Sequence, residues 1–177
     1  SPEKMFEKYS TLAKEATFVA KKKYLMHVRD DDGKIVDKWK VTGIDISSFA
    51  ISLLKEDGIR GIQSILPNIP LDDNIFDIVV GTEILEHMDN DKELLMQCNR
   101  VCKNGGKIIF VVPDNCLGPD EESEHMRKYT YGELHQLLSL VSKDVFIQKF
   151  TDSFTTIFKG RKINISIPQL IGIITKE

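Results

Sequence analysis

Asp45 is the first residue of this chain whose position indicates a definite chemistry. It follows the apolar, β-branched run that opens Val41-Thr42-Gly43-Ile44-Asp45-Ile46-Ser47. A carboxylate at the C-terminal tip of a parallel strand can accept hydrogen bonds from both hydroxyls of a ribose, so Asp45 could bind a nucleoside. The alternative is a helix cap, because Ser47 and Ser48 stand directly before an apolar helix.

His87 is a second candidate, within the segment Glu83-Ile84-Leu85-Glu86-His87-Met88. A histidine imidazole can act as a general base toward a hydroxyl or an amine, so His87 could accept a proton from an acceptor. The competing interpretation is a histidine that only forms a hydrogen bond. For Glu83 and Glu86, a functional role competes equally with a simple solvated or first-turn carboxylate.

Three further polar side chains, His125, Arg127 and Tyr129, follow the acidic loop Asp114–Glu124. They could close over a substrate, or they could be an ordinary charged run before a helix. No cluster of histidine, cysteine and acidic residues has the spacing of metal ligands, so we expect no metal site.

Strands and helices of about ten residues alternate around these candidates. The alternation predicts right-handed βαβ units and a parallel sheet, with ligands at the carboxyl ends of its strands. The last two strands have no helix between them and indicate an antiparallel edge. The predicted elements are strands Val41–Asp45, Gly61–Leu66, Phe76–Gly81, Lys107–Val112, Val145–Phe150 and Gln169–Thr175, and helices Ser48–Glu56, Asn90 or Asp91 to about Val101, and Tyr131–Val141 with Thr130 and Glu133 as a capping box.

The N-terminal part is less clear. Residues from Pro2 to about Ala16 have the apolar spacing of an amphipathic helix. For Tyr24–Trp39, a hairpin around the Asp-rich turn at Gly33 competes with a short helix followed by a loop.

Composition favours one soluble α/β domain over residues 1–177, in which residues 1–22 hold the N-terminal helix and a possible first strand. The net charge of -3 gives no basic surface for nucleic acid, and no apolar run approaches the ~20 residues of a membrane span. Cys98, Cys102 and Cys116 are interpreted as reduced packing residues, and we expect a cytoplasmic protein.

Four segments, in this order, resemble the class I S-adenosylmethionine-dependent methyltransferases. More narrowly they are similar to the small-molecule branch that includes ubiquinone-biosynthesis-type enzymes, as is His125-Met126-Arg127-Lys128-Tyr129-Thr130. The four segments are Val-Thr-Gly-Ile-Asp-Ile-Ser (41–47), Ile-Pro-Leu-Asp-Asp-Asn-Ile-Phe-Asp-Ile-Val-Val (69–80), Glu-Ile-Leu-Glu-His-Met (83–88) and Lys-Asn-Gly-Gly-Lys-Ile-Ile-Phe-Val-Val-Pro (103–113).

The resemblance, which covers about Val41 to Glu177, implies a Rossmann-like three-layer sandwich whose sheet is mostly parallel with an antiparallel C-terminal edge strand. It implies S-adenosylmethionine as the cofactor and methyl transfer to a small-molecule acceptor by in-line displacement. The implied contacts are Asp45 with the ribose, Ile46 with the adenine, Ser64, Ile65 and Leu66 near the adenine amino group, Thr82 and Glu83 beside the methionine part, His87 near the transferred methyl, and His125, Arg127 and Tyr129 at the substrate.

The sequence departs from the family in one respect. The family has a strand and an Asp/Glu-x-Gly-x-Gly-x-Gly loop about 20 residues before the ribose carboxylate, but Gly33 is the only glycine before Val41. Three explanations stay open: residues missing from the sequence between about Thr17 and Tyr24, a true deletion, or a segment rebuilt as a hairpin. We favour the first, because every other landmark is intact.

Two other functions compete with the methyltransferase. A true deletion would give a non-catalytic, methyltransferase-like binding module. A nicotinamide-dependent Rossmann enzyme would share the ribose carboxylate, but its Gly-x-Gly-x-x-Gly fingerprint is also absent from the sequence.

Overall fold

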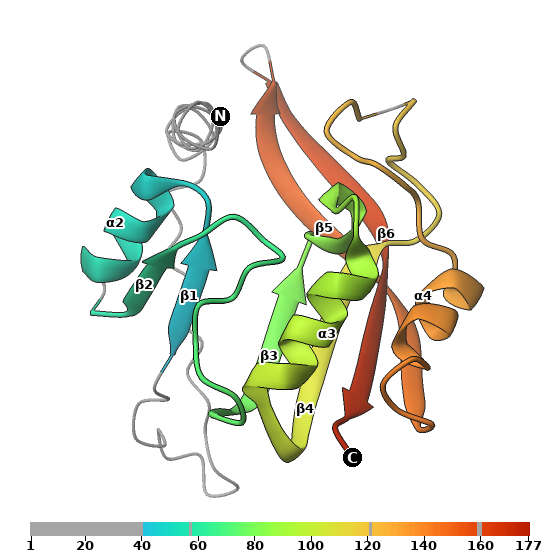
Figure 1. The fold of residues 1–177 in the computed structure, drawn as a ribbon. Helices are drawn as coiled ribbons and strands as arrows, with labels where there is room; N and C mark the ends of the chain where they lie inside the picture. The colour runs from blue at the N-terminus through green and yellow to red at the C-terminus, as the bar shows by residue number, and fades with distance from the viewer. Residues whose placement is uncertain (1–40, 57, 121, 159–160) are drawn as a thin grey trace, which may run out of the picture. The chain divides into compact units, whose positions relative to one another are not determined.

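The computed structural model describes residues 41–56, 58–120, 122–158 and 161–177 (Figure 1). The chain divides into two compact units, Ser1–Ile65 and Leu66–Glu177. The predicted N-terminal helix, the alternatives for Tyr24–Trp39 and the question of the glycine loop lie outside the described residues. Whether residues 1–177 form one domain therefore stays a prediction.

The described part of the first unit is one strand–helix–strand motif. Strand β1 (Thr42–Asp45) pairs in parallel with β2 (Arg60–Gln63), and helix α2 (Ser48–Glu56) connects them. Ser47 caps the helix, because its side-chain oxygen accepts the backbone N–H of Ala50 at 3.2 Å. The predicted βαβ unit, whose first strand ends at Asp45, is confirmed, although its second strand ends at Gln63 and not at Leu66.

The second unit is built on a four-stranded sheet with the order β3-β4-β6-β5. Its strands are β3 (Phe76–Thr82), β4 (Cys102–Pro113), β5 (Val145–Phe158) and β6 (Arg161–Thr175), and its helical segments are η1 (Leu85–His87), α3 (Asp91–Val101) and α4 (Tyr131–Leu138). Strands β3 and β4 are parallel, whereas β4–β6 and β5–β6 are antiparallel.

The C-terminal strand was predicted to lie at the edge of the sheet, but in the structure it does not. β6 lies between β4 and β5, so β5 forms the antiparallel edge of this sheet and β3 forms the other edge. Since only one of the three pairings is parallel, a mostly parallel sheet is not confirmed for the described residues. Strands β5 and β6 also extend well beyond the apolar runs that predicted them, because they pair with each other from Val145↔Ile174 to Phe158↔Arg161.

The segment around Gly105 also differs from the prediction. Asn104-Gly105-Gly106 lie before the predicted strand Lys107–Val112, but in the structure these residues belong to the irregular start of β4. Gly105 has a φ of +78°, which favours glycine, and its N–H donates to the carbonyl of Lys176 at 2.9 Å.

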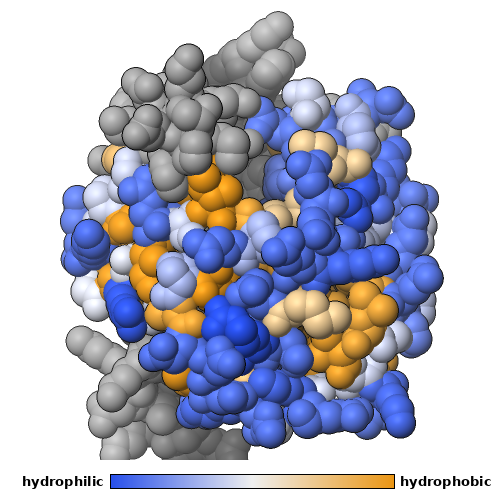
Figure 2. Space-filling model, viewed as in Figure 1, coloured by the Kyte–Doolittle hydropathy of each residue, from blue (hydrophilic) through white to orange (hydrophobic). Residues whose placement is uncertain are grey.

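The core of this unit lies on one face of the sheet. Ile108, Phe110 and Val112, which alternate along β4, are fully buried on that face. Phe110 pairs with Gly81 and Gly172, and leucines of α4 occupy the space above Gly172. Helix α3 buries Leu94, Leu95, Cys98 and Val101 against the sheet. Figure 2 shows mostly hydrophilic residues over its outer side, as amphipathicity requires.

The opposite face carries exposed apolar side chains. Val80 is 59% exposed and Phe146 is 55% exposed, and both are in register with the positions that point away from Phe110. No helix described in this unit covers that face, so the third layer of the predicted sandwich is not confirmed.

No helix among the described residues is long and apolar enough to cross a membrane.

Candidate functional site

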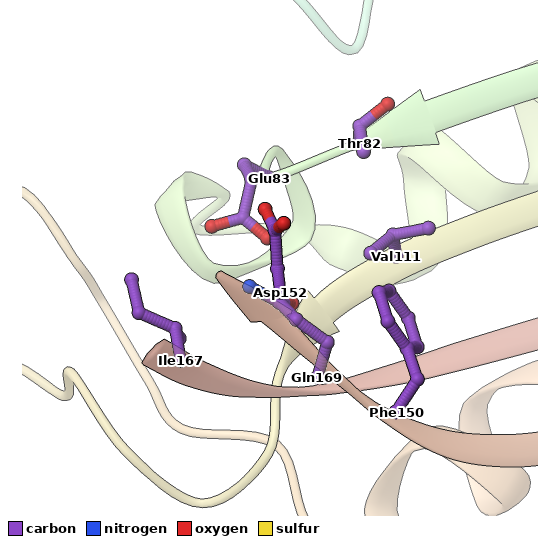
Figure 3. Close-up of a pocket in the computed structure, with 7 residues that line it drawn as sticks. All are labelled: Thr82, Glu83, Val111, Phe150, Asp152, Ile167 and Gln169. Carbon is purple, nitrogen blue, oxygen red and sulfur yellow. The ribbon is translucent and has the colours of Figure 1, made fainter. Parts of the chain in front are cut away.

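A half-open cavity of about 480 Å³ lies at the C-terminal end of β3 (Figure 3). The pairing register places Thr82, Val111 and Phe150 on the sheet face opposite the core. The full lining is Thr82, Glu83, Val111, Phe150, Asp152, Ile167 and Gln169. The cavity therefore combines an apolar wall with two carboxylates, at the end of a parallel strand where α/β proteins bind ligands.

Glu83 is held in place by its backbone. It has a φ of 50°, in the left-handed region, and its N–H donates to the carbonyl of Val111 at 3.0 Å. Partial burial, and secondly the charge of Glu86, raise the pKa of its carboxyl, although a side-chain hydrogen bond from Gln169 opposes this. A strained, conformationally fixed carboxylate in a cavity is a common feature of functional sites.

Glu86 follows in the 3₁₀ segment η1 and is 1% exposed. Neither of its carboxylate oxygens has a hydrogen-bond partner among the described residues. Burial raises the pKa of this carboxyl above its usual range. Of the alternatives that the sequence left open for Glu86, the structure excludes a solvated carboxylate and places the residue in the first turn of η1.

The rings of His87 and His125 meet edge to face, with centroids 4.5 Å apart. The Nδ1 of His87 lies 2.9 Å from the carbonyl oxygen of Glu124, and the Nδ1 of His125 contacts the carbonyl of Leu117. One ligating atom each from Glu86, His87 and His125 lie within 4.8 Å of one another.

Sequence reasoning missed this cluster, because His125 stands far along the chain from His87. The sequence gives the spacing of Glu83, Glu86 and His87. It does not give the path of the acidic loop, which places His125 beside them. The cavity residues Phe150, Asp152, Ile167 and Gln169 were also missed, since no pattern marks them.

Arg127 and Tyr129 bind the protein itself. Arg127 Nη1 donates to Asp91 Oδ2 at 2.6 Å, and Arg127 Nη2 donates to the carbonyls of Met88 and Asp89. The hydroxyl of the buried Tyr129 donates to the same Asp91 oxygen at 2.6 Å. These hydrogen bonds hold the segment of residues 125–130 against the start of α3. The expected substrate role of Arg127 and Tyr129 stays a prediction.

In the first unit, Asp45 accepts the backbone N–H of Ser47 at Oδ1, at 2.7 Å. The helix cap is Ser47 and not Asp45, so the bond to Ser47 is a local turn contact that uses one of the two carboxylate oxygens of Asp45. The carbonyl of Ile46 accepts Gln63 Nε2 at 3.0 Å, and the buried Ser64 donates its N–H to the carbonyl of Asp45. Ile65 ends this unit and Leu66 begins the next, so the predicted adenine contacts are divided between them.

Comparisons with known proteins show what the sequence of this chain is similar to. Residues 23–110 match the family model described as "Methyltransferase domain". An uncharacterized protein of Methanocaldococcus jannaschii is 30% identical over 97 residues, which are 54% of this chain and 47% of that protein. The chain thus spans about half the length of this curated relative.

Three solved structures share the fold. An S-adenosylmethionine-dependent methyltransferase of Thermotoga maritima has a TM-score of 0.58 at 17% identity, over 77% of this chain and 73% of that chain. Another, from Methanosarcina mazei, has a TM-score of 0.54 at 17% identity, over 77% and 81%. A chain from a Haloferax volcanii complex of a methyltransferase with its activator Trm112 has a TM-score of 0.57 at 13% identity, over 82% and 74%. These likenesses show a shared Rossmann-like fold.

Proposed function

We propose that the chain transfers a methyl group from S-adenosylmethionine to a small-molecule acceptor. The observation that carries the proposal is the cavity at the carboxyl end of β3, lined by Thr82 and Glu83, in a chain with a methyltransferase-domain match. The narrower placement in the ubiquinone-biosynthesis-type branch is part of this proposal.

Taken separately, each unit has side chains that suit one part of the cofactor. In the first, Asp45 Oδ1 is used by Ser47, and Oδ2 forms no bond with the described residues, so it can accept from a ribose hydroxyl. In the second, Glu83 and Asp152 give the cavity a negative field, which favours the positive sulfonium. We assign Asp45 and Ile46 to the nucleoside and Thr82 and Glu83 to the methionine end.

S-adenosylmethionine supplies an electrophilic methyl group, and the protein must align an acceptor with it. Alignment supplies most of the rate of an in-line displacement. The fixed backbone at Glu83 and the hydrogen bond from Gln169 suit this positioning role. His87 is exposed, so its imidazole can accept a proton from an acceptor that needs a base.

The cavity supports an acceptor of small-molecule size. Its volume of about 480 Å³ lies within the roughly 300–1,000 Å³ that ligand sites usually have. Val111, Phe150 and Ile167 form apolar walls, and Phe150 is 40% exposed. An acceptor with a flat or apolar body would bury this surface.

Calorimetry with S-adenosylhomocysteine tests the proposal. We expect one site per chain with a dissociation constant in the micromolar range, and at least tenfold weaker binding by Asp45→Ala. Asp73→Ala is the matched control, because Asp73 is an exposed carboxylate that forms an ion pair with Arg100. No binding by a protein of verified sequence would overturn the proposal.

That negative result would favour the second candidate, a non-catalytic binding module. Its support is the absent glycine loop, together with Ser64, Ile65 and Leu66 where the family often has an acidic residue. Such a module would bind neither S-adenosylhomocysteine nor S-adenosylmethionine.

A further inference from the structure

One buried carboxylate and two imidazoles form a cluster beside Glu83. Single ligating atoms of Glu86, His87 and His125 lie within 4.8 Å of one another. We propose that these three side chains bind a divalent metal ion of the class that accepts both nitrogen and oxygen ligands, such as Zn²⁺ or Mn²⁺. Two imidazoles and one carboxylate form the three-ligand set of open zinc sites, in which water or a ligand takes the fourth position.

The burial of Glu86 is the first argument. Its side chain is 1% exposed, and both carboxylate oxygens lack a hydrogen-bond partner among the described residues. An ionised carboxylate in such a position is strongly disfavoured unless a cation compensates it. A bound divalent ion would satisfy both oxygens and supply the missing charge.

The hydrogen bonds of the two histidines are the second argument. The Nδ1 of His87 is 2.9 Å from the Glu124 carbonyl, and the Nδ1 of His125 contacts the Leu117 carbonyl. Because a carbonyl can only accept, each Nδ1 must carry the proton, and the neutral ring then has its lone pair on Nε2. Metal-binding histidines are oriented in this way, by a carbonyl on the other ring nitrogen.

The backbone holds the cluster together without a ligand. Glu86 and His87 are neighbours in η1, and the N–H of Met126 donates to the carbonyl of Glu86 at 2.7 Å. The N–H of His125 donates to the carbonyl of Glu122 at 3.0 Å. The site therefore joins η1 to the end of the acidic loop, and a bound ion would cross-link them.

Glu83 connects this cluster with the cavity. Its carboxyl lines the cavity and interacts electrostatically with Glu86, His87 and His125. His87 is exposed, so one side of the cluster is open to solvent. The ion would thus sit where it can be reached from outside and can balance two neighbouring carboxylates. With the ion bound, the Nε2 lone pair of His87 is a metal ligand, so a role of His87 as a base applies only to the metal-free protein.

Metal binding is measured directly, without cofactor or acceptor. The protein is dialysed against a chelator and titrated with Zn²⁺, Mn²⁺ or Mg²⁺ alone, with calorimetry for affinity and elemental analysis for stoichiometry. We expect one ion per chain, with Zn²⁺ and Mn²⁺ bound more tightly than Mg²⁺, which prefers oxygen ligands.

Three variants locate the site. Glu86→Gln and His87→Ala are expected to weaken Zn²⁺ binding at least tenfold. His135→Ala is the matched control, because it removes an exposed imidazole of α4 that is outside the cluster. His87 is exposed, so its variant is expected to fold, and circular dichroism checks this.

Thermal unfolding gives an independent readout for Glu86→Gln. In chelator the variant should be at least as stable as the wild type, since it removes a buried unpaired charge, but Zn²⁺ should raise the unfolding temperature of the wild type alone. No binding by the wild type, tighter binding of Mg²⁺, or affinity unchanged in Glu86→Gln and His87→Ala would overturn the proposal. Its outcome is independent of methyl transfer.

Discussion

The hydroxyl of Tyr129 donates a 2.6 Å hydrogen bond to Oδ2 of Asp91, the first residue of α3. Asp91 Oδ1 accepts the backbone N–H of Lys92 at 2.8 Å, and Arg127 supplies a second bond to Oδ2. The carboxylate also lies at the positive end of the helix dipole. One buried acidic side chain therefore fixes the segment that carries His125 against the helix that follows η1.

Tyr129→Phe should destabilise the protein by about 1–3 kcal/mol, because Asp91 loses a hydrogen bond from a buried donor. Urea unfolding monitored by circular dichroism measures the change in the free energy of unfolding. Tyr131→Phe is the control, since Tyr131 is 46% exposed and should change stability by less than about 0.5 kcal/mol. Equal effects of the two substitutions would contradict the structural role of Tyr129.

Alkaline pH should destabilise the protein through the same residue. Burial, and secondly the hydrogen bond to Asp91, raise the pKa of Tyr129 far above its ordinary value of 10.0, with Arg127 opposing and Glu86 adding to the shift. Above about pH 10 the unfolded chain loses this proton and the folded chain keeps it, so the free energy of unfolding falls as pH rises, by at most about 1.4 kcal/mol per unit.

Urea unfolding at pH 9, 10 and 11 measures this dependence. Lysines also titrate in this range, so the relevant quantity is the difference between the wild type and Tyr129→Phe. The variant should lose less stability than the wild type between pH 10 and pH 11. An identical slope for both proteins would show that Tyr129 does not carry the effect.

Elements that depend on neighbouring residues could be predicted from the sequence. Helix α2 has the predicted bounds Ser48–Glu56. Asn90 accepts the backbone N–H of Glu93 at 3.1 Å, and Thr130 and Glu133 form the predicted capping box. These contacts join residues three positions apart, so the local sequence specifies them. Among the described helices only α4 differs from its predicted bounds, because it ends at Leu138 instead of Val141.

Contacts between distant segments could not be predicted. The position of β6 between β4 and β5 depends on pairing partners, which the apolar run Gln169–Thr175 does not specify. The hairpin of β5 and β6 is long because residues such as Ser153 and Ser166 pair across it, although their exposed polar side chains give no strand pattern. The approach of His125 to Glu86 likewise depends on the path of the acidic loop.

The three cysteines should differ in reactivity at pH 8. Burial raises the pKa of Cys98 from 9.0 to about 12 and also raises that of the fully buried Cys102, whereas Cys116 is half-buried. Since the thiolate is the nucleophile, one thiol per chain should react quickly with an aromatic disulfide reagent and two only after unfolding. Cys116→Ser should remove the fast phase. Rapid reaction of two or three thiols in the native protein would contradict this assignment.

Gly81→Ala should destabilise the folded protein at the end of β3. A Cβ at this position would lie 2.6 Å from Phe110 Cε1 and 3.0 Å from Ile84 Cγ2. Phe110 is fully buried in the core on one face of the sheet, so this overlap can be relieved only by repacking the core, and we expect a loss of about 1–3 kcal/mol in the free energy of unfolding. The displaced strand end would also shift Thr82 and Glu83, and should weaken S-adenosylhomocysteine binding measured by calorimetry.

Gly132→Ala provides the matched control for that substitution. A Cβ at Gly132 would meet nothing within 4 Å, and Gly132 is the second residue of helix α4. Alanine is favoured over glycine in a helix by up to about 1 kcal/mol, so this variant should be as stable as the wild type or more stable. If Gly81→Ala and Gly132→Ala unfold at the same urea concentration, the close packing of Phe110 against Gly81 is not what fixes the end of β3.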